Sequence, residues 1–140
     1  MTPERLAQIH GEAFAPERGW TAAEFSDLLK QPTIALFARP EGFAIVRVVA
    51  DEAELLTLAV IPNARRKGVA NELMRKWLSD VDASDAFLEV AEDNTAATSL
   101  YRQHGFEACG RRKAYYARPT GVAADAVLMQ LAMGPGRSSK

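Results

Sequence analysis

A basic turn that leads into an amphipathic helix is the segment whose residue types best suit chemistry. It reads Arg65-Arg66-Lys67-Gly68-Val69-Ala70 and follows the apolar run Glu54–Ile61. Gly68 and Ala70 are small, so a ligand can approach the backbone closely. The first N–H groups of the helix lack partners inside it and lie at its positive end. Together with the three cationic side chains, these groups predict a site for a phosphate-like anion. The alternative is a basic first turn that only faces solvent.

Helices and an antiparallel meander are predicted ahead of this turn. Leu6, Ile9, His10 and Ala13 follow helical spacing behind Thr2 as a cap and Pro3 in the first turn. Ala15–Gly19 breaks this helix, and Thr21 with Glu24 forms a capping box for a second helix that ends before Pro32. Short turns separate the three strand-like runs that follow, which favours antiparallel pairing. These runs are Thr33–Ala38, Phe43–Ala50 and Glu54–Ile61.

The second half alternates between helical and strand patterns. The spacing predicts a helix over Lys67–Asp82, then a strand over Ala86–Ala91. Asn94 is a good N-cap for the next helix, and Gly105 is a favoured C-terminal stop. Two final strands are predicted, split by Pro119, Thr120 and Gly121; they are Phe106–Ala117 and Asp125–Ala132. This order predicts an α/β or α+β fold with a mixed sheet.

Length, charge and cysteine content limit the possible functions. The 140 residues predict one domain over 1–133 with a flexible tail over 134–140. A formal net charge of −1 favours neither a nucleic acid nor a membrane surface as a partner. The charge is uneven along the chain: residues 1–64 hold nine acids and five bases, and residues 65–140 hold nine acids and twelve bases. The single cysteine, Cys109, is typical of the reducing cytoplasm, with packing as its expected role. Two histidines and one cysteine make a zinc site improbable, so no metal is predicted.

The basic turn carries a resemblance to a known family. Arg65-x-x-Gly68-x-Ala70 after an apolar strand is similar to the [Q/R]-x-x-G-x-[G/A] signature of the GCN-five-related N-acetyltransferases (GNAT). The resemblance continues over residues 43–133 and is strongest to the ribosomal-protein-alanine (RimI-type) branch. The further matching residues are Phe87-Leu88-Glu89-Val90, Asn94, Ala97, Leu100-Tyr101, Gly105-Phe106, Arg112, Tyr115-Tyr116, Pro119-Thr120-Gly121 and Asp125-Ala126.

The resemblance implies a fold and two departures from it. The expected fold is a single GNAT domain, with a central mixed, mostly antiparallel sheet of six or seven strands flanked by about four helices. The first strand of the family is expected to be missing or confined to Met1–Thr2. The loop Ala15–Gly19 is longer than expected for the branch, and it falls where substrate would bind.

Acetyl-coenzyme A is the cosubstrate that the resemblance implies, in a V-shaped opening between the fourth and fifth strands of the family. The backbone of Leu58, Ala59 and Val60 would line the pantetheine arm, with the Val60 amide facing the thioester oxygen. The turn and first helical residues would hold the pyrophosphate, and Asn94 would bind the coenzyme or act only as a helix cap. The implied turn residues are Arg65, Arg66, Lys67, Gly68, Val69, Ala70 and Asn71.

The resemblance also assigns a base and an acid. Glu89 would take a proton from the attacking amine, directly or through a water, and Tyr101 would protonate the departing thiolate. Each residue also has a purely structural interpretation. Glu89 could be an outward-pointing strand residue, because side chains alternate across a sheet, and Tyr101 could be a core aromatic.

The acceptor implied by the branch is the N-terminal α-amino group of a protein, such as a small-subunit ribosomal protein. Trp20, Tyr115 and Tyr116 would border the acceptor groove. The acidic residues Asp51, Glu52, Glu54, Glu92 and Asp93 could suit a basic peptide or could be surface turns. The alternatives are acetylation of a small-molecule amine or a lysine side chain, and a non-catalytic acyl-coenzyme A module. The sequence does not indicate an oligomeric state.

Overall fold

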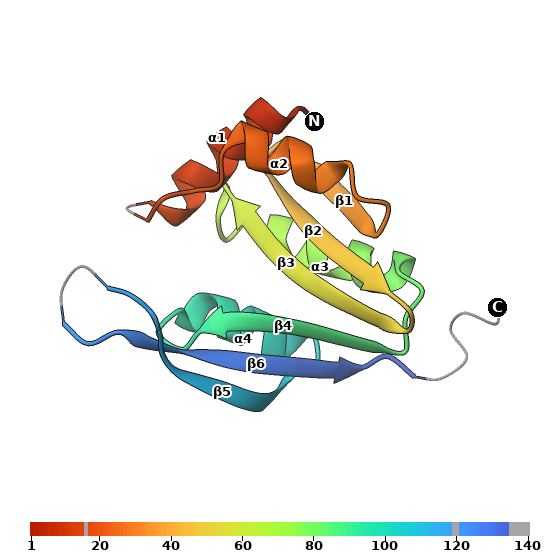
Figure 1. Ribbon diagram of the computed structural model, residues 1–140, viewed down its shortest axis with the longest axis vertical. Coiled ribbons are helices and arrows are strands. Elements are labelled where there is room, and N and C mark those ends of the chain that lie inside the picture. The colour runs from red at the N-terminus through yellow and green to blue at the C-terminus, as the bar shows by residue number, and fades with distance from the viewer. Residues whose placement is uncertain (16, 119–120, 135–140) are drawn as a thin grey trace. The chain divides into compact units, whose positions relative to one another are not determined.

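The computed structural model describes residues 1–15, 17–118 and 121–134. The chain divides into two compact units, which are Met1–Val49 with Leu56–Val81, and Ala50–Leu55 with Asp82–Lys140. The elements, labelled in Figure 1, are α1 (Pro3–Phe14), α2 (Ala22–Leu29), β1 (Ile34–Arg39), β2 (Gly42–Val49), β3 (Glu52–Val60), the 3-10 turn η1 (Pro62–Ala64), α3 (Val69–Asp80), β4 (Asp85–Ala91), α4 (Thr95–Gln103), β5 (Glu107–Tyr116) and β6 (Ala124–Ala132). The strand order is β1-β2-β3-β4-β6-β5, and β3 contributes residues to both units.

The two N-terminal helices of the first unit begin at the caps that the sequence predicts. The Thr2 hydroxyl accepts the Arg5 N–H at the start of α1, and Pro3 occupies the first turn. Thr21 and Glu24 form the reciprocal capping box of α2. These bonds satisfy N–H groups that a helix start leaves without partners.

The core of the first unit lies where these helices meet the strands. Leu6 and Ile9 of α1 and Phe25 of α2 are fully buried against Phe43, Ile45 and Ala59 of the sheet. The alternate β2 residues Ala44 and Val46 are also fully buried. Because successive side chains point to opposite faces, β2 is covered on both sides. Helix α3, which contacts β1 and β2, supplies the second cover, and Figure 1 shows it on the side of the strands opposite α1 and α2.

The second unit is built on β4, β6 and β5. The first residues of β3 pair in parallel with β4, from Glu52↔Asp85 to Leu55↔Leu88. Strand β6 pairs antiparallel with both β4 and β5, and the β5–β6 register shifts twice. Asn94 caps α4 by accepting the Ala97 N–H, and Gly105 follows the helix with a φ of 96°. That conformation is open to glycine at little cost, so Gly105 lets the chain turn into β5.

The expected fold class is confirmed, and several element boundaries differ from the predicted ones by one or two residues. Among the described residues the sheet has six strands and the α-helices number four. Helix α3 begins at Val69 and not at Lys67, because Arg66 and Gly68 adopt left-handed backbone conformations that a helix cannot include. Met1 and Thr2 lie in no strand. Apart from Gly134, the predicted tail lies outside the described residues, as do Pro119 and Thr120. In the part of the chain that the structure describes, no helix has the length and apolar character needed to cross a membrane.

Candidate active site

The turn between β3 and α3 contains two residues with left-handed backbone conformations. After η1, Arg66 has a φ of 64° and Gly68 a φ of 85°. Gly68 is the N-cap of α3, and no side chain caps the helix there. A Cβ at Gly68 would meet nothing within 4 Å, so glycine is required by its backbone conformation and not by space. The predicted anion site thus falls on a helix start without a side-chain cap, and its role in binding an anion stays a prediction.

Arg65 has a partner that the sequence did not reveal. Its Nη2 donates to the carbonyl oxygen of Ala13 at 2.6 Å, close to the end of α1. The last carbonyls of a helix lack partners and lie at its negative end, so a cation is favourable there. Arg65 thus anchors the turn to α1, and its neighbours Arg66 and Lys67 are exposed at the turn. The remaining coenzyme candidates of this unit are Leu58, Ala59 and Val60 in β3, and Val69, Ala70 and Asn71 in the first turn of α3.

Glu89 forms an ion pair in the middle of β4. Its Oε2 lies 3.2 Å from Nε of Arg112 in β5, and its side chain is 24% exposed. The guanidinium of Arg112 in turn lies over the ring of Tyr115, 5.4 Å from its centroid. Glu89 is therefore neither a fully exposed strand residue nor a buried unpaired one. The sequence matched Arg112 to the family but gave it no role, because no local signal pairs residues of β4 and β5, which are separated in the sheet by β6.

Tyr101 is a buried phenol in the same unit. Its side chain packs edge-on against Phe106 with ring centroids 6.2 Å apart. Burial raises the pKa of Tyr101 to about 12, with a smaller contribution from Tyr116. The core-aromatic interpretation of Tyr101 thus describes its packing, and the raised pKa keeps its proton in place throughout the neutral range.

The paired tyrosines of β5 lie in the same unit. Tyr115 is 53% exposed, and its ring meets that of Tyr116 edge-on at 5.2 Å. Burial raises the pKa of Tyr116, and the negative charge of Glu89 adds to that rise. The second unit therefore brings together Glu89, Tyr101, Tyr115 and Tyr116. Asn94 also belongs to this unit, and its predicted role as a helix cap is confirmed.

Trp20, the third predicted acceptor residue, lies in the first unit beside a buried histidine. The Trp20 backbone N–H donates to Nδ1 of His10 at 3.0 Å, and Nε2 of His10 lies 3.1 Å from the Thr57 hydroxyl. His10 is 5% exposed, and burial lowers its pKa from 6.5 to about 4. Glu24 and Arg18 act on this pKa in opposite directions and more weakly. The imidazole is therefore neutral at physiological pH.

The lowered pKa of His10 predicts an acid-dependent loss of stability. As the pH falls below 6.5 the unfolded chain takes up a proton at His10, whereas the folded imidazole stays neutral down to about pH 4. Stability is thus fully present above about pH 6.5, and we expect it to fall by roughly 1–3 kcal/mol between pH 6.5 and 4. Thermal unfolding of the wild type and His10→Asn across this range measures the effect. A pH dependence in this window that is equal in both proteins would contradict the assignment.

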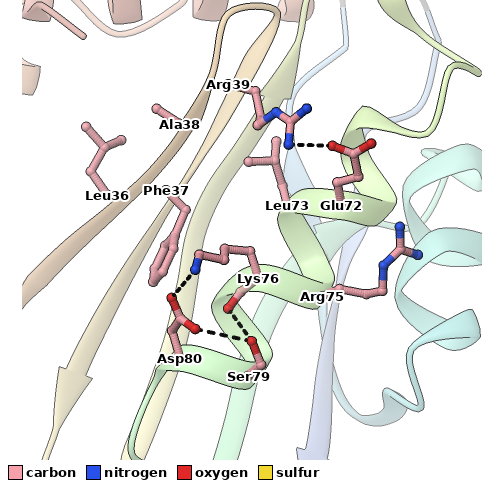
Figure 2. Close-up of a pocket in the computed structure, with 10 residues that line it drawn as sticks. All are labelled: Leu36, Phe37, Ala38, Arg39, Glu72, Leu73, Arg75, Lys76, Ser79 and Asp80. Carbon is pink, nitrogen blue, oxygen red and sulfur yellow. Dashed lines mark hydrogen bonds and ion pairs between the residues drawn. The ribbon is translucent and has the colours of Figure 1, made fainter.

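Two cavities open on the first unit. One cavity, of about 730 Å³, lies between β1 and α3 and is drawn in Figure 2. Both carboxylates that line it form ion pairs, Glu72 with Arg39 at 2.7 Å and Asp80 with Lys76 at 3.0 Å. No predicted site residue lines this cavity. The second, of about 470 Å³, is lined by Trp20 together with Glu24, Asp27, Leu28, Gln31, Arg47 and Leu56. Among the described residues, no cluster of three or more His, Cys, Asp or Glu side chains could hold a metal ion.

Comparisons with known proteins identify the family and the fold of the chain. The sequence model of the acetyltransferase (GNAT) family matches residues 5–106. The ribosomal protein bS18-alanine N-acetyltransferase of Haemophilus ducreyi is 39% identical over 93 residues, which make up 64% of each chain. The chain thus spans just under two thirds of that relative's length. The N-alpha-acetyltransferase RimI of Mycobacterium tuberculosis is 31% identical over 122 residues, or 81% of this chain and 77% of that protein.

Solved structures show the same fold. The ribosomal-protein-S18-alanine N-acetyltransferase of Escherichia coli superposes with a TM-score of 0.81 at 29% identity, covering 96% of this chain and 90% of that one. The structure of Arabidopsis thaliana NAA60 in complex with acetyl-CoA superposes with a TM-score of 0.73 at 23% identity, covering 93% and 92% of the two chains. From the matched residues, the signature turn and the shared fold, we conclude that the chain belongs to the acetyltransferase (GNAT) family.

Proposed function

We propose that the chain is an N-acetyltransferase that moves the acetyl group of acetyl-CoA to an amine. The observation that carries this proposal is the turn before α3, where left-handed Arg66 and Gly68 precede uncapped helical N–H groups in a chain of the GNAT family. Such a turn suits the pyrophosphate of a coenzyme. Cys109 is exposed on β5, so the core-packing role expected for it from the sequence is wrong.

Binding of acetyl-CoA is assigned to residues of β3 and the turn. The N–H groups of Val69, Ala70 and Asn71 would bind the pyrophosphate, with Arg66 and Lys67 adding charge. Leu58, Ala59 and Val60 would align the pantetheine arm through their backbone, and Arg65 would hold the turn in place through Ala13. The Val60 N–H would stabilise the negative charge that develops on the thioester oxygen. Asn94, which caps α4, is also assigned to the coenzyme.

The reaction needs one base and one acid. A protonated amine cannot attack a thioester, and an α-amino group with a pKa of about 7.7–8.0 gives up its proton to a modest base. Glu89 is assigned this step, directly or through a water. The amine nitrogen then bonds to the acetyl carbon, the C–S bond breaks, and the coenzyme leaves as a thiolate. Tyr101 is assigned the proton donation that converts the thiolate to the thiol. The acylated nitrogen then gives up its second proton, which returns the Tyr101 phenolate to the phenol, and Glu89 releases its proton to solvent, so one proton is released for each ammonium group acetylated. No covalent enzyme intermediate is needed.

The acceptor that we propose is the N-terminal α-amino group of a protein, of the ribosomal-protein-alanine type. The support is the likeness to proteins named as bS18-alanine and N-alpha-acetyltransferases, one of which is 39% and another 31% identical to this chain. Trp20, Tyr115 and Tyr116 are assigned to the acceptor. The proposed compartment is the cytoplasm, in line with a reduced Cys109.

Mass spectrometry of an acetylation reaction tests the proposed function. The full chain is incubated with acetyl-CoA and a peptide that begins Ala-Arg, and the expected product carries one acetyl group on the α-amine. A panel of polyamines, amino sugars and α-blocked lysine peptides is run in parallel. Turnover confined to those amines would replace the proposed acceptor. Tight acetyl-CoA binding without turnover of any amine would indicate a non-catalytic acyl-CoA module.

The turn assignment makes its own prediction. Gly68→Ala adds a methyl group that meets no other atom but strains a backbone with a φ of 85°. Gly121→Ala is the control, because it places the same strain, at a φ of 81° and also in open space, far along the sequence from the turn. We expect both variants to lose about 1 kcal/mol of unfolding free energy. Only Gly68→Ala should weaken acetyl-CoA binding in calorimetry, by about tenfold, because its strain shifts N–H groups at the coenzyme. Equal affinities in the two variants would contradict the turn assignment.

A further inference from the structure

His10 is a buried titratable side chain that the proposed reaction does not use. It lies on the face of α1 that also buries Leu6 and Ile9. A leucine there would fill the space without the cost of taking an imidazole out of water. Buried polar groups are retained where hydrogen bonds fix an arrangement that apolar packing would leave undetermined. The partners of His10 therefore indicate what it does.

Both ring nitrogens of His10 are engaged, and their partners define the tautomer. The Trp20 backbone N–H can only donate, so Nδ1 accepts and carries no proton. Nε2 then carries the proton and donates to the Thr57 hydroxyl at 3.1 Å. A single neutral imidazole thus joins three segments that are distant in sequence, namely α1, the residue before the cap of α2, and β3.

Trp20 is held by His10 in two ways. Besides the backbone hydrogen bond, its indole stacks on the imidazole with ring centroids 4.9 Å apart and planes inclined by 26°. Phe14 and Phe25 also contact the His10 ring, at 4.5 and 5.5 Å between centroids, so the imidazole cannot swing away. The same indole lines the 470 Å³ cavity. His10 therefore fixes a large aromatic surface that a ligand can reach.

We propose that His10 is a positioning residue for the acceptor amine, acting through Trp20 and Thr57. This rests on the proposed function, in which Trp20 contacts the acceptor and β3 carries the acetyl donor. Thr57 directly precedes Leu58–Val60 in β3. The His10 imidazole thus fixes Trp20, which is assigned to the acceptor, relative to Leu58–Val60 of β3, which are assigned to the acetyl donor. All of these residues belong to the first unit. Loss of the imidazole affects acceptor binding and leaves donor binding intact.

Steady-state kinetics with both substrates varied separates positioning from mere packing. In His10→Leu both hydrogen bonds are lost, and the KM of the acceptor is expected to rise roughly tenfold, the size of one lost buried hydrogen bond, with the acetyl-CoA KM within about twofold of wild type. In His10→Asn the amide oxygen replaces Nδ1 as acceptor for Trp20, and the acceptor KM is expected to recover to within about threefold. Thr57→Val keeps the shape of the side chain and removes only the hydrogen bond between His10 Nε2 and the Thr57 hydroxyl. A purely structural role would lower the unfolding temperature and leave the acceptor KM unchanged in every folded variant, which would overturn the proposal.

A double-mutant cycle with Trp20→Ala tests whether His10 acts through Trp20. If it does, His10→Leu raises the acceptor KM less once Trp20 is gone, and the rise that remains is the part carried by Thr57. Additive effects overturn the route through Trp20. Hydrogen exchange of the Trp20 amide provides a readout without turnover, and it is expected to accelerate in His10→Leu but not in His10→Asn. If the wild type acetylates no amine, the proposed function fails, and unchanged exchange in His10→Leu separately overturns the positioning.

Discussion

Replacing Glu89 by glutamine is expected to lower kcat for the acceptor peptide by roughly 10²–10⁴-fold, the usual contribution of a general base. Glutamine keeps the shape and cannot accept a proton from the ammonium group. The acetyl-CoA dissociation constant is expected to stay within about twofold of wild type, because Glu89 is not among the residues assigned to the coenzyme. Rapid-quench or steady-state kinetics with calorimetry of acetyl-CoA binding measures both quantities.

Two controls make the Glu89 result specific. Glu107→Gln is the same chemical change on an exposed residue of β5 in the same unit, and its kcat is expected to match wild type. Arg112→Met removes the ion-pair partner of Glu89 at 3.2 Å and leaves the carboxylate in place. Because the carboxylate then has a freer choice of rotamer, kcat is expected to fall less than in Glu89→Gln. Full activity of Glu89→Gln would contradict the assignment of the base.

Replacing Tyr101 by phenylalanine is expected to lower kcat by about 10²-fold or more, because the thiolate then leaves without a proton donor. The ring contact with Phe106 at 6.2 Å is retained, so the unfolding temperature should change little. With a pKa of about 12 the wild-type phenol keeps its proton at every pH between 6 and 9. The variant should therefore be slower by a similar factor across that range, and a titration near neutral pH that disappears in the variant would contradict the assignment.

The other two tyrosines provide the contrast for Tyr101. Tyr115→Phe and Tyr116→Phe remove hydroxyls assigned to the acceptor, so their expected effect is on the acceptor KM and not on kcat. Tyr115 is the more informative of the two, because it is 53% exposed and its ring is covered by Arg112. If Tyr115→Phe lowered kcat as much as Tyr101→Phe does, the role of proton donor would have to be assigned to Tyr115 in β5.

Local signals in the sequence were sufficient for most of the elements. Thr2, Thr21 and Asn94 are caps because their side-chain oxygens reach N–H groups only two or three residues ahead, and all three form those bonds. Gly68 and Gly105 have positive φ, as glycines next to helix ends commonly do. The shifted start of α3 depends on the left-handed Arg66, a conformation for which a non-glycine residue gives no signal. The coenzyme and acceptor roles of the site residues remain predictions.

Periodicity and caps predicted the element order and the mixed sheet, and the resemblance over residues 43–133 indicated the family. Only the tertiary structure decided which side chains meet: Arg112 on Glu89, the Ala13 carbonyl on Arg65, and Trp20 with Thr57 on His10. The physical reason is that helix caps and periodicity depend on residues close together in the chain. The contacts that the tertiary structure decides join distant residues: His10 and Trp20 are 10 positions apart, and Ala13 and Arg65 are 52 positions apart. Which side chains meet across the fold depends on strand register and helix packing, and no short sequence pattern encodes either of these.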